Sequence, residues 1–461
     1  MISPRTRELG FLIPAGLLGA LGMASVASAR ADALEFGPVP GAIGVFAVFL
    51  AMHVALRLRA PQADPYLLPT VGLLVAIGLV ELDRISPELA ADQAVWVAVG
   101  GAAFIAVLLF LPDHRVLERY RYLIGLAGVG LLIVTMIFGT RINGARLWIE
   151  IGGGQTVQLG EVAKVLIVIF LAAYLRDKRE LLAIPTTRVM GVPVPPMAAL
   201  GPVLVFLAAC LALVAILNDF GTALLFLGVF LAMLYLATGR VAYTGIGLAL
   251  FVVGSAAVYA VVPRIQDRID AWIGPFDDPQ GQGYQLVQSL YAMAEGGVVG
   301  PGLGRAFLVD AAGDPVVPAL QTDFMFTAVA TELGYVGGVG LLLGFLVLIQ
   351  RGFVIAANAN DGFSKLLAGG LTAAVGLQAL LIIGGVTRLI PLTGVTLPFM
   401  SYGGSSVVVN FALIALLLVI SNRSRTGNAP PRLRRRDREA ARAVQREERA
   451  RERERERELM A

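Results

Sequence analysis

The sequence predicts an all-α protein that crosses a membrane about twelve times. Hydrophobic residues make up 57% of the 461 residues and charged residues only 15%, and the mean hydropathy is +0.76. This composition is far more apolar than that of a soluble domain, so the soluble globular class is excluded. The apolar residues also form runs of the length that a membrane-spanning helix needs, roughly 20 residues. Basic residues, finally, gather in every second connecting loop.

Twelve apolar segments have the required length. They lie near 9–29, 39–58, 67–83, 93–111, 120–139, 157–175, 196–217, 221–238, 242–262, 324–349, 364–387 and 403–421. The first also resembles a secretory signal peptide, because Arg5 and Arg7 precede it and Ala-Ser-Ala comes before Arg30. Its apolar stretch is longer than a usual signal core, so we favour a retained helix.

The basic residues of the loops give the orientation. With the N-terminus inside, the inner loops before residue 422 hold fourteen Lys and Arg, and the outer loops hold eight. Cytoplasmic loops carry the excess of basic residues. The sequence therefore predicts a multi-pass membrane protein with both termini in the cytoplasm, and it places the long loop 263–323 on the outer face.

That outer loop contains a candidate helix. Residues 284–295 have the periodicity of a short amphipathic helix, and a glycine-rich stretch, 296–304, follows them. Loops of this length are usually functional or disordered. The helical periodicity favours a functional loop.

The C-terminal tail carries most of the excess charge. Residues 422–461 hold 14 Arg against 8 Asp and Glu, whereas the rest of the chain is nearly balanced. We expect a solvated cytoplasmic tail that is attracted to anionic membrane lipids, and no nucleic acid partner.

Cysteine and histidine are scarce. Cys210 is the only cysteine, and His53 and His114 are the only histidines. One cysteine excludes a disulfide within the chain, and two histidines do not supply the usual zinc-binding set. The sequence therefore predicts no protein-built metal site and no covalently bound cofactor.

Three ionisable residues near or within the apolar segments are functional candidates, because charge is costly there. Glu161 and Lys164 are three residues apart on one helix face, where they can neutralise one another. A structural ion pair and the wall of a polar cavity are both open interpretations. Glu332 is interpreted as a buried structural carboxyl.

Asp323 is the third candidate, at the outer end of the segment 324–349. Aspartate is among the best N-cap residues, so a capping role is one interpretation. A desolvated aspartate beside an apolar groove would also have a raised pKa and would make a better general base. The two roles are compatible.

Arginines of the outer loops suit an anionic substrate. The guanidinium group matches phosphate geometry, although these residues are equally suited to anchor the membrane interface. The candidates are Arg146, Arg264, Arg268 and Arg388. Asp277 and Asp278, which precede Pro279, are interpreted as turn formers and not as metal ligands.

The last outer segment, residues 391–406, is rich in Pro, Gly, Ser and Thr where a spanning helix should begin. Irregular backbone is tolerated at membrane depth only inside protein or beside a cavity. We predict a re-entrant or broken helix, with an ordinary tight loop as the alternative.

Together these segments resemble the SEDS family (shape, elongation, division and sporulation), which includes RodA and FtsW. Six motifs occur in the family's order, and they span about residues 67–421. They are 144–149, 158–164, 218–222, 283–289 with 302–304, 322–324 with 332–334, and 391–406. The sequence departs from the family's pattern at Leu147, Leu159, Gly160 and Ile382. Its N-terminus and residues 387–394 are more similar to actinobacterial RodA-like proteins than to FtsW.

The resemblance implies three regions. Residues 1–66 would be an added pair of helices, residues 67–421 a ten-helix glycosyltransferase core, and residues 422–461 the cytoplasmic tail. The family's essential aspartate corresponds to Asp323, and its helix-embedded glutamate and lysine correspond to Glu161 and Lys164. The polar residues of the matching motifs complete the expected substrate-binding set, which is Arg146, Glu161, Lys164, Arg264, Arg268, Gln288, Thr322, Arg388, Ser401 and Ser405.

The implied activity is peptidoglycan glycosyl transfer, in which lipid II is polymerised at the outer face of the inner (cytoplasmic) membrane during cell-wall elongation. We expect inverting transfer with Asp323 as general base, and arginine or a divalent cation such as Mg²⁺ at the diphosphate. The expected partners are lipid II, undecaprenyl-diphosphate-linked glycan and a class B penicillin-binding protein. A lipid II flippase, an FtsW-like division polymerase and a non-catalytic scaffold are the alternatives.

Overall fold

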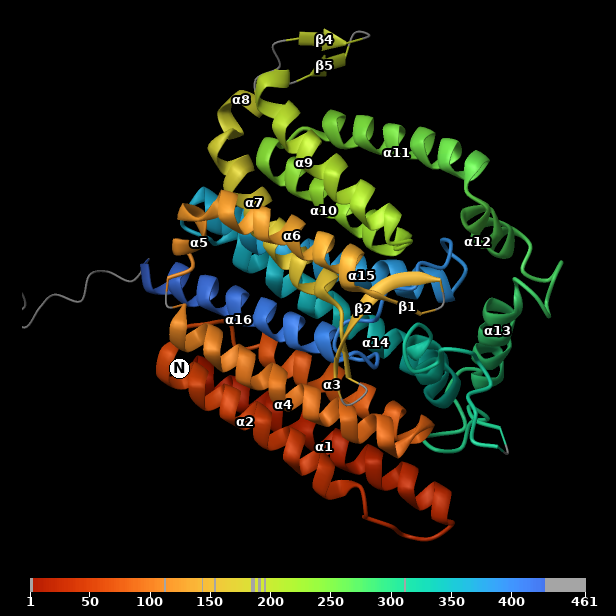
Figure 1. Cartoon of the computed structure of the whole chain (residues 1–461). Helices are drawn as coiled ribbons and strands as arrows, with labels where there is room; N and C mark the ends of the chain where they lie inside the picture. The colour runs from red at the N-terminus through yellow and green to blue at the C-terminus, as the bar shows by residue number, and fades with distance from the viewer. Residues whose placement is uncertain are drawn as a thin grey trace, which may run out of the picture.

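The computed structural model describes residues 3–427 except 112, 143, 153–154, 184–186, 190–191, 195 and 311. From residue 428 onward, the charged tail predicted at 422–461 lies outside the described residues. The chain is a helical bundle with two small antiparallel sheets (Figure 1).

All twelve predicted apolar segments form helices. These are α1 (Pro4–Ala31), α2 (Val39–Arg59), α3 (Leu67–Ile85), α4 (Pro87–Phe110), α6 (Arg121–Phe138), α7 (Leu159–Asp177), α9 (Met197–Ile216), α10 (Phe220–Thr238), α11 (Val241–Val261), α14 (Met325–Ala357), α15 (Gly362–Val386) and α16 (Gly404–Gly427). Ten helices of the described residues are long and apolar enough to cross a membrane. The two that fall short, α3 and α7, carry additional charged residues.

The remaining elements are short. They are α5 (Val116–Arg119), α8 (Arg179–Ala183), α12 (Pro263–Ile273), α13 (Tyr284–Gly296), and the strands β1 (Thr140–Ile142), β2 (Ala145–Gly152), β3 (Gln155–Val157), β4 (Thr187–Val189) and β5 (Val192–Val194). β1, β2 and β3 form one antiparallel sheet, and β4 pairs with β5. The sequence prediction included α13 but none of the strands. Four of the strands have only three residues, which give little periodic signal, and the eight residues of β2 were interpreted as a loop.

The centre of the bundle is formed by α15 and α16, which are the most buried of the ten candidate membrane spans. Glycines allow close helix contacts there. A Cβ atom on Gly100 of α4 would lie 2.6 Å from the ring of Phe411 on α16, so a larger residue at position 100 would clash with that ring. At the edge of the bundle, α11 contacts little besides α10 and α12 (Figure 1).

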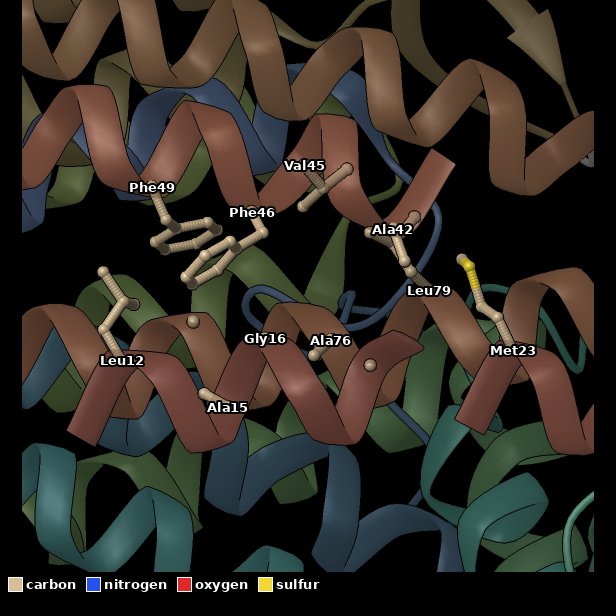
Figure 2. Close-up of a pocket in the computed structure, with 12 residues that line it drawn as sticks. Leu12, Ala15, Gly16, Met23, Ala42, Val45, Phe46, Phe49, Ala76 and Leu79 are labelled. Carbon is tan, nitrogen blue, oxygen red and sulfur yellow. The ribbon is translucent and has the colours of Figure 1, made fainter. Parts of the chain in front are cut away.

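The N-terminal helices α1 and α2 pack on α3 and α4. Between α1, α2 and α3 lies an apolar cavity of about 20 Å³, lined by residues such as Leu12, Phe46 and Leu79 (Figure 2). Arg5, Glu8 and His53 form a buried polar cluster at the other end of α1. Glu8 Oε1 lies 2.6 Å from His53 Nδ1, and Arg5 pairs with Glu8 and donates to the carbonyl of Ala63. This cluster fixes the pair of helices to the body of the protein.

The helices of the loop 263–323, α12 and α13, lie at the end of the bundle opposite to the N-terminus (Figure 1). Glu332 of α14 holds the glycine-rich stretch of that loop. Its carboxylate accepts from the backbone of Gly304 at 3.0 Å and from Arg84 at 3.2 Å. Glu332 is completely buried, so its contacts fit the structural role predicted for it.

Residues 391–403 contain no regular secondary structure, and α16 begins at Gly404. The side chains of Val395, Leu397 and Met400 are buried. The segment is therefore irregular backbone inside the protein, as the composition indicates. The expectation of a re-entrant or broken helix here is wrong, because residues 391–403 contain no helical segment. Pro391 and Pro398 lack a backbone N–H and disfavour the helical conformation of the residues before them.

Candidate active site

Asp323 lies in a tight turn directly before α14. Ala319 has a φ of +60°, and its carbonyl accepts from the backbone N–H groups of Thr322 and Asp323 at 3.1 and 3.0 Å. The N-cap position of α14 belongs to Phe324, and no side chain caps the helix. The capping role predicted for Asp323 is therefore wrong, because the turn places its carboxylate one residue too early.

The Asp323 carboxylate lines a cavity of about 210 Å³. Four segments that are distant in the sequence form the wall: α12, the start of α13, the Asp323 turn and the irregular segment after α15. The lining residues are Asp267, Arg268, Ala271, Trp272, Gln282, Gln285, Leu286, Asp323, Phe324, Leu392 and Gly394. The cavity therefore combines two carboxylates, one guanidinium group and two side-chain amides with apolar side chains.

Burial raises the pKa of Asp323 from its ordinary value to about 6. A hydrogen bond from Thr322 and the positive charge of Arg268 act in the opposite direction. Near neutral pH the carboxylate is thus largely ionised, and its affinity for a proton is higher than that of an exposed aspartate. This is the property that general base catalysis requires.

Arg268 reaches the same cavity from α12. Its Nη1 lies 3.4 Å from the carbonyl oxygen of Thr393, and a Cβ atom on Gly394 would lie 3.8 Å from its Nη2 and 3.9 Å from Asp323 Oδ2. The Asp323 carboxylate and the Arg268 guanidinium group therefore face the same cavity. A guanidinium group there can bind and neutralise phosphate oxygens.

Arg388 has a different environment. It has a φ of +60°, its Nε donates to the carbonyl of Trp272 at 2.9 Å, and it also donates to the carbonyl of Ile273. Trp272 Nε1 donates in return to the carbonyl of Arg388 at 3.1 Å. These contacts hold the C-terminal end of α12 against the segment after α15. Arg388 is not among the residues that line the cavity.

Glu161 and Lys164 form a second polar cluster within the bundle. Lys164 Nζ lies 2.7 Å from Glu161 Oε2 and 2.7 Å from Gln378 Oε1, and both charged side chains are buried. Gln378 Nε2 donates in turn to the carbonyl of Thr396 at 2.9 Å. The pair is thereby connected to the irregular segment that also borders the cavity.

Asp219 interacts with the charges of both Glu161 and the cavity residue Arg268. It caps α10 by accepting from the backbone of Thr222 at 3.0 Å. Burial raises the pKa of Asp219, the Glu161 charge adds to this rise, and the Arg268 charge opposes it. Asp219 is therefore close enough to both Glu161 and Arg268 to interact with their charges.

The other predicted site residues lie outside the cavity. Arg146 of β2 donates to the carbonyl of Met136 at 3.1 Å, and Ser405 Oγ accepts from the backbone of Gln158 at 3.1 Å. Gln288 is half-buried on α13, and Ser401 Oγ donates to the carbonyl of Thr322. The side chain of Arg264 lies outside the described part of the structure. Asp278 accepts from Gly281 and Gln282 and forms the predicted turn.

Sequence reasoning missed Asp267, Trp272, Gln282 and Gln285. Helical spacing could have indicated Trp272, because it lies four residues after Arg268 on the same amphipathic helix. Gln285 lies one turn before Gln288, the residue that was chosen instead.

Among the described residues, no group of three or more His, Cys, Asp or Glu could hold a metal ion.

Comparisons with known proteins agree with this architecture. Residues 66–426 match the cell cycle protein family named for FtsW, RodA and SpoVE. The peptidoglycan glycosyltransferase RodA of Mycobacterium tuberculosis is 41% identical over 82% of this chain and 82% of its own length. RodA of Mycobacterium leprae is 40% identical over 84% of this chain and 85% of its own length.

Solved structures share the fold. A chain from a structure on the coordination of polymerization and crosslinking by a peptidoglycan synthase complex superposes with a TM-score of 0.64, at 26% identity over 80% of this chain and 99% of that chain. The rod shape determining protein RodA of Thermus thermophilus superposes with a TM-score of 0.56, at 25% identity over 78% of this chain and 97% of that one. This chain is a multi-pass protein of the bacterial cytoplasmic membrane, and it belongs to the SEDS family of FtsW, RodA and SpoVE.

Proposed function

We propose that this chain polymerises lipid II into glycan strands, with Asp323 as the general base. As a RodA-type member of its family, the protein is a peptidoglycan glycosyltransferase that acts in cell elongation. The observation that carries the mechanism is the shared cavity of Asp323 and Arg268, which joins a carboxylate of raised pKa to a fixed cation.

The proposed step is a single displacement. The 4-hydroxyl oxygen of the acceptor sugar attacks the anomeric carbon of the donor, and the bond from that carbon to the diphosphate oxygen breaks, with inversion. Asp323 takes the hydroxyl proton as the new bond forms. A positioned base contributes roughly 10²- to 10⁴-fold to such a reaction. The diphosphate leaves as an anion, so no second carboxylic acid is needed to protonate it.

The leaving diphosphate needs positive charge. Arg268 is the cavity residue that supplies it, and bidentate contact with phosphate oxygens suits a guanidinium group. Mg²⁺ is the alternative, because it is bound through one or two carboxylates together with substrate phosphates. Asp267 and Asp323 are the cavity carboxylates that would hold such an ion, which would neutralise the diphosphate.

We propose further that α3 and α7 also cross the membrane, which gives twelve spans with both termini in the cytoplasm. Both are 19 residues long, and α7 is buried over most of its length. In this arrangement α1 and α2 are an addition to a ten-helix core. The family match that begins at residue 66 supports that division.

A class B penicillin-binding protein is the proposed partner. The similarity to a chain of a peptidoglycan synthase complex supports this assignment. Such a transpeptidase would crosslink the glycan strands that this protein makes.

Glycan synthesis by the purified protein with its partner tests the proposal. The assay follows polymer formation from labelled lipid II by the wild type, by Asp323→Asn and by Asp277→Asn. Asp277 is exposed on the same loop outside the cavity, so its variant is a control for the same chemical change. Polymer is expected from the wild type and from Asp277→Asn only. Polymerisation by Asp323→Asn at the wild-type rate would remove Asp323 from the mechanism.

A further inference from the structure

A buried glutamine of α4, Gln93, holds residues 401–403, a segment that lies against the Asp323 turn. Gln93 is only 2% exposed, and both ends of its amide make hydrogen bonds to that segment. Its Nε2 donates to the carbonyl of Ser401 at 3.1 Å, and its Oε1 accepts from the backbone of Gly403 at 3.2 Å. One side chain thus fixes the chain on either side of residue 402.

The other face of this segment contacts the residues before Asp323. The backbone N–H of Tyr402 donates to the carbonyl of Gln321 at 2.8 Å. Ser401 Oγ accepts from the backbone of Leu397 at 3.0 Å and donates to the carbonyl of Thr322. Because Gln321 and Thr322 directly precede Asp323, a displacement of residues 401–403 would move the Asp323 backbone.

The residues directly before this segment, Phe399 and Met400, are also tightly constrained. A Cβ atom on Gly78 of α3 would lie 2.6 Å from Met400 Cα, so α3 and Met400 are in direct backbone contact. Phe399 has a φ of +67°, a conformation that a phenylalanine keeps only when its surroundings impose it. Gln93 supplies the hydrogen bonds on the α4 side of this packing.

We propose that Gln93 is a positioning residue, which acts through residues 401–403 to fix the Asp323 carboxylate in the cavity. This inference rests on the proposed function, in which Asp323 is the base. Gln93 does not line the cavity and therefore acts without touching the substrate. Small displacements matter at this point, because a shift of about 1 Å in a reacting group can cost about 10²-fold in rate.

The test compares kcat and KM for lipid II in the partner-bound wild type and in Gln93→Leu. Leucine has a similar size and removes both hydrogen bonds. We expect kcat to fall by about 10- to 100-fold, with KM unchanged within about twofold. Tyr174→Phe is the matched control, because it removes another buried interhelical hydrogen bond, the one from Tyr174 to the carbonyl of Ala199. Its kcat should equal that of the wild type.

A second variant covers the case in which Gln93→Leu does not fold. Ser401→Ala removes only the hydroxyl that joins the segment to Thr322, and it should lower kcat in the same way. The double variant should lose less than the product of the two single losses, because both act through one set of contacts.

Hydrogen exchange of residues 319–324 separates this inference from the proposed function. Gln93→Leu should speed exchange there, whereas Tyr174→Phe should not. A folded Gln93→Leu protein with wild-type kcat, or with a raised KM and unchanged kcat, would overturn the positioning role. Full activity of Asp323→Asn would instead refute the proposed function, whatever Gln93→Leu shows.

Discussion

Replacing Arg268 with glutamine should move the pH dependence of glycan synthesis to higher pH. Burial raises the pKa of Asp323 to about 6, and the charge of Arg268 limits that rise. The base must be ionised to accept a proton, so the rate rises with pH through the pKa of Asp323 and levels off above it. Without the positive charge, the ionised form is less favourable and the pKa rises further.

The structure gives the size of this effect. The distances of Arg268 Nη2 and Asp323 Oδ2 from the Cβ position of Gly394 place the two atoms within about 8 Å of each other. At an effective dielectric constant of about 20, Coulomb's law then gives about 2 kcal/mol, or about 1.5 pKa units. Screening by salt reduces it, so we expect the midpoint to rise by about one unit.

The assay is the initial rate of lipid II polymerisation between about pH 5 and pH 9. Arg268→Lys keeps the charge, so its midpoint should match that of the wild type, even if its plateau rate is lower. Arg305→Gln is the control, because Arg305 is exposed in the same loop outside the cavity. An unchanged midpoint in Arg268→Gln would refute the electrostatic coupling of Arg268 to the base.

Three further predictions concern stability, each measured by thermal unfolding in detergent. Lys164→Met should destabilise the protein by about 3–5 kcal/mol, because it leaves the Glu161 charge buried without its partner, and Glu161→Gln should recover much of the loss when the two are combined. Glu8→Leu should destabilise the protein by a similar amount, because it leaves the charge of Arg5 buried without its partner. Glu332→Gln should cost about 1–3 kcal/mol and should speed hydrogen exchange at residues 297–304, since it weakens the acceptor for Gly304.

Matched substitutions test the specificity of these effects. Glu35→Leu is the control for Glu8→Leu, because Glu35 is exposed in the loop after α1 and should tolerate the change. A Lys164→Met protein of wild-type stability would show that the pair with Glu161 is not ionised. Unaltered exchange at residues 297–304 in Glu332→Gln would contradict the role of its carboxylate in holding the glycine-rich stretch.

Part of the candidate site could be predicted from the sequence. Asp323 was predicted as a general base and Arg268 as a group that binds an anionic substrate, and the structure brings the two residues into one cavity. The capping role of Asp323 was predicted wrongly, because the turn depends on the left-handed conformation of Ala319, a residue type that seldom adopts it. The role of Gln93 could not be predicted from the sequence, since its hydrogen-bond partners lie more than 300 positions away.

The sequence by itself determined that this chain is a bundle of membrane helices, and it determined nearly where each helix lies. A membrane helix satisfies its backbone hydrogen bonds within one segment, so its composition and length are sufficient evidence. Only the tertiary structure decided which residues share the cavity. Its wall joins α12, α13, the Asp323 turn and the segment around Gly394, and contacts between such distant segments leave no local pattern in the sequence.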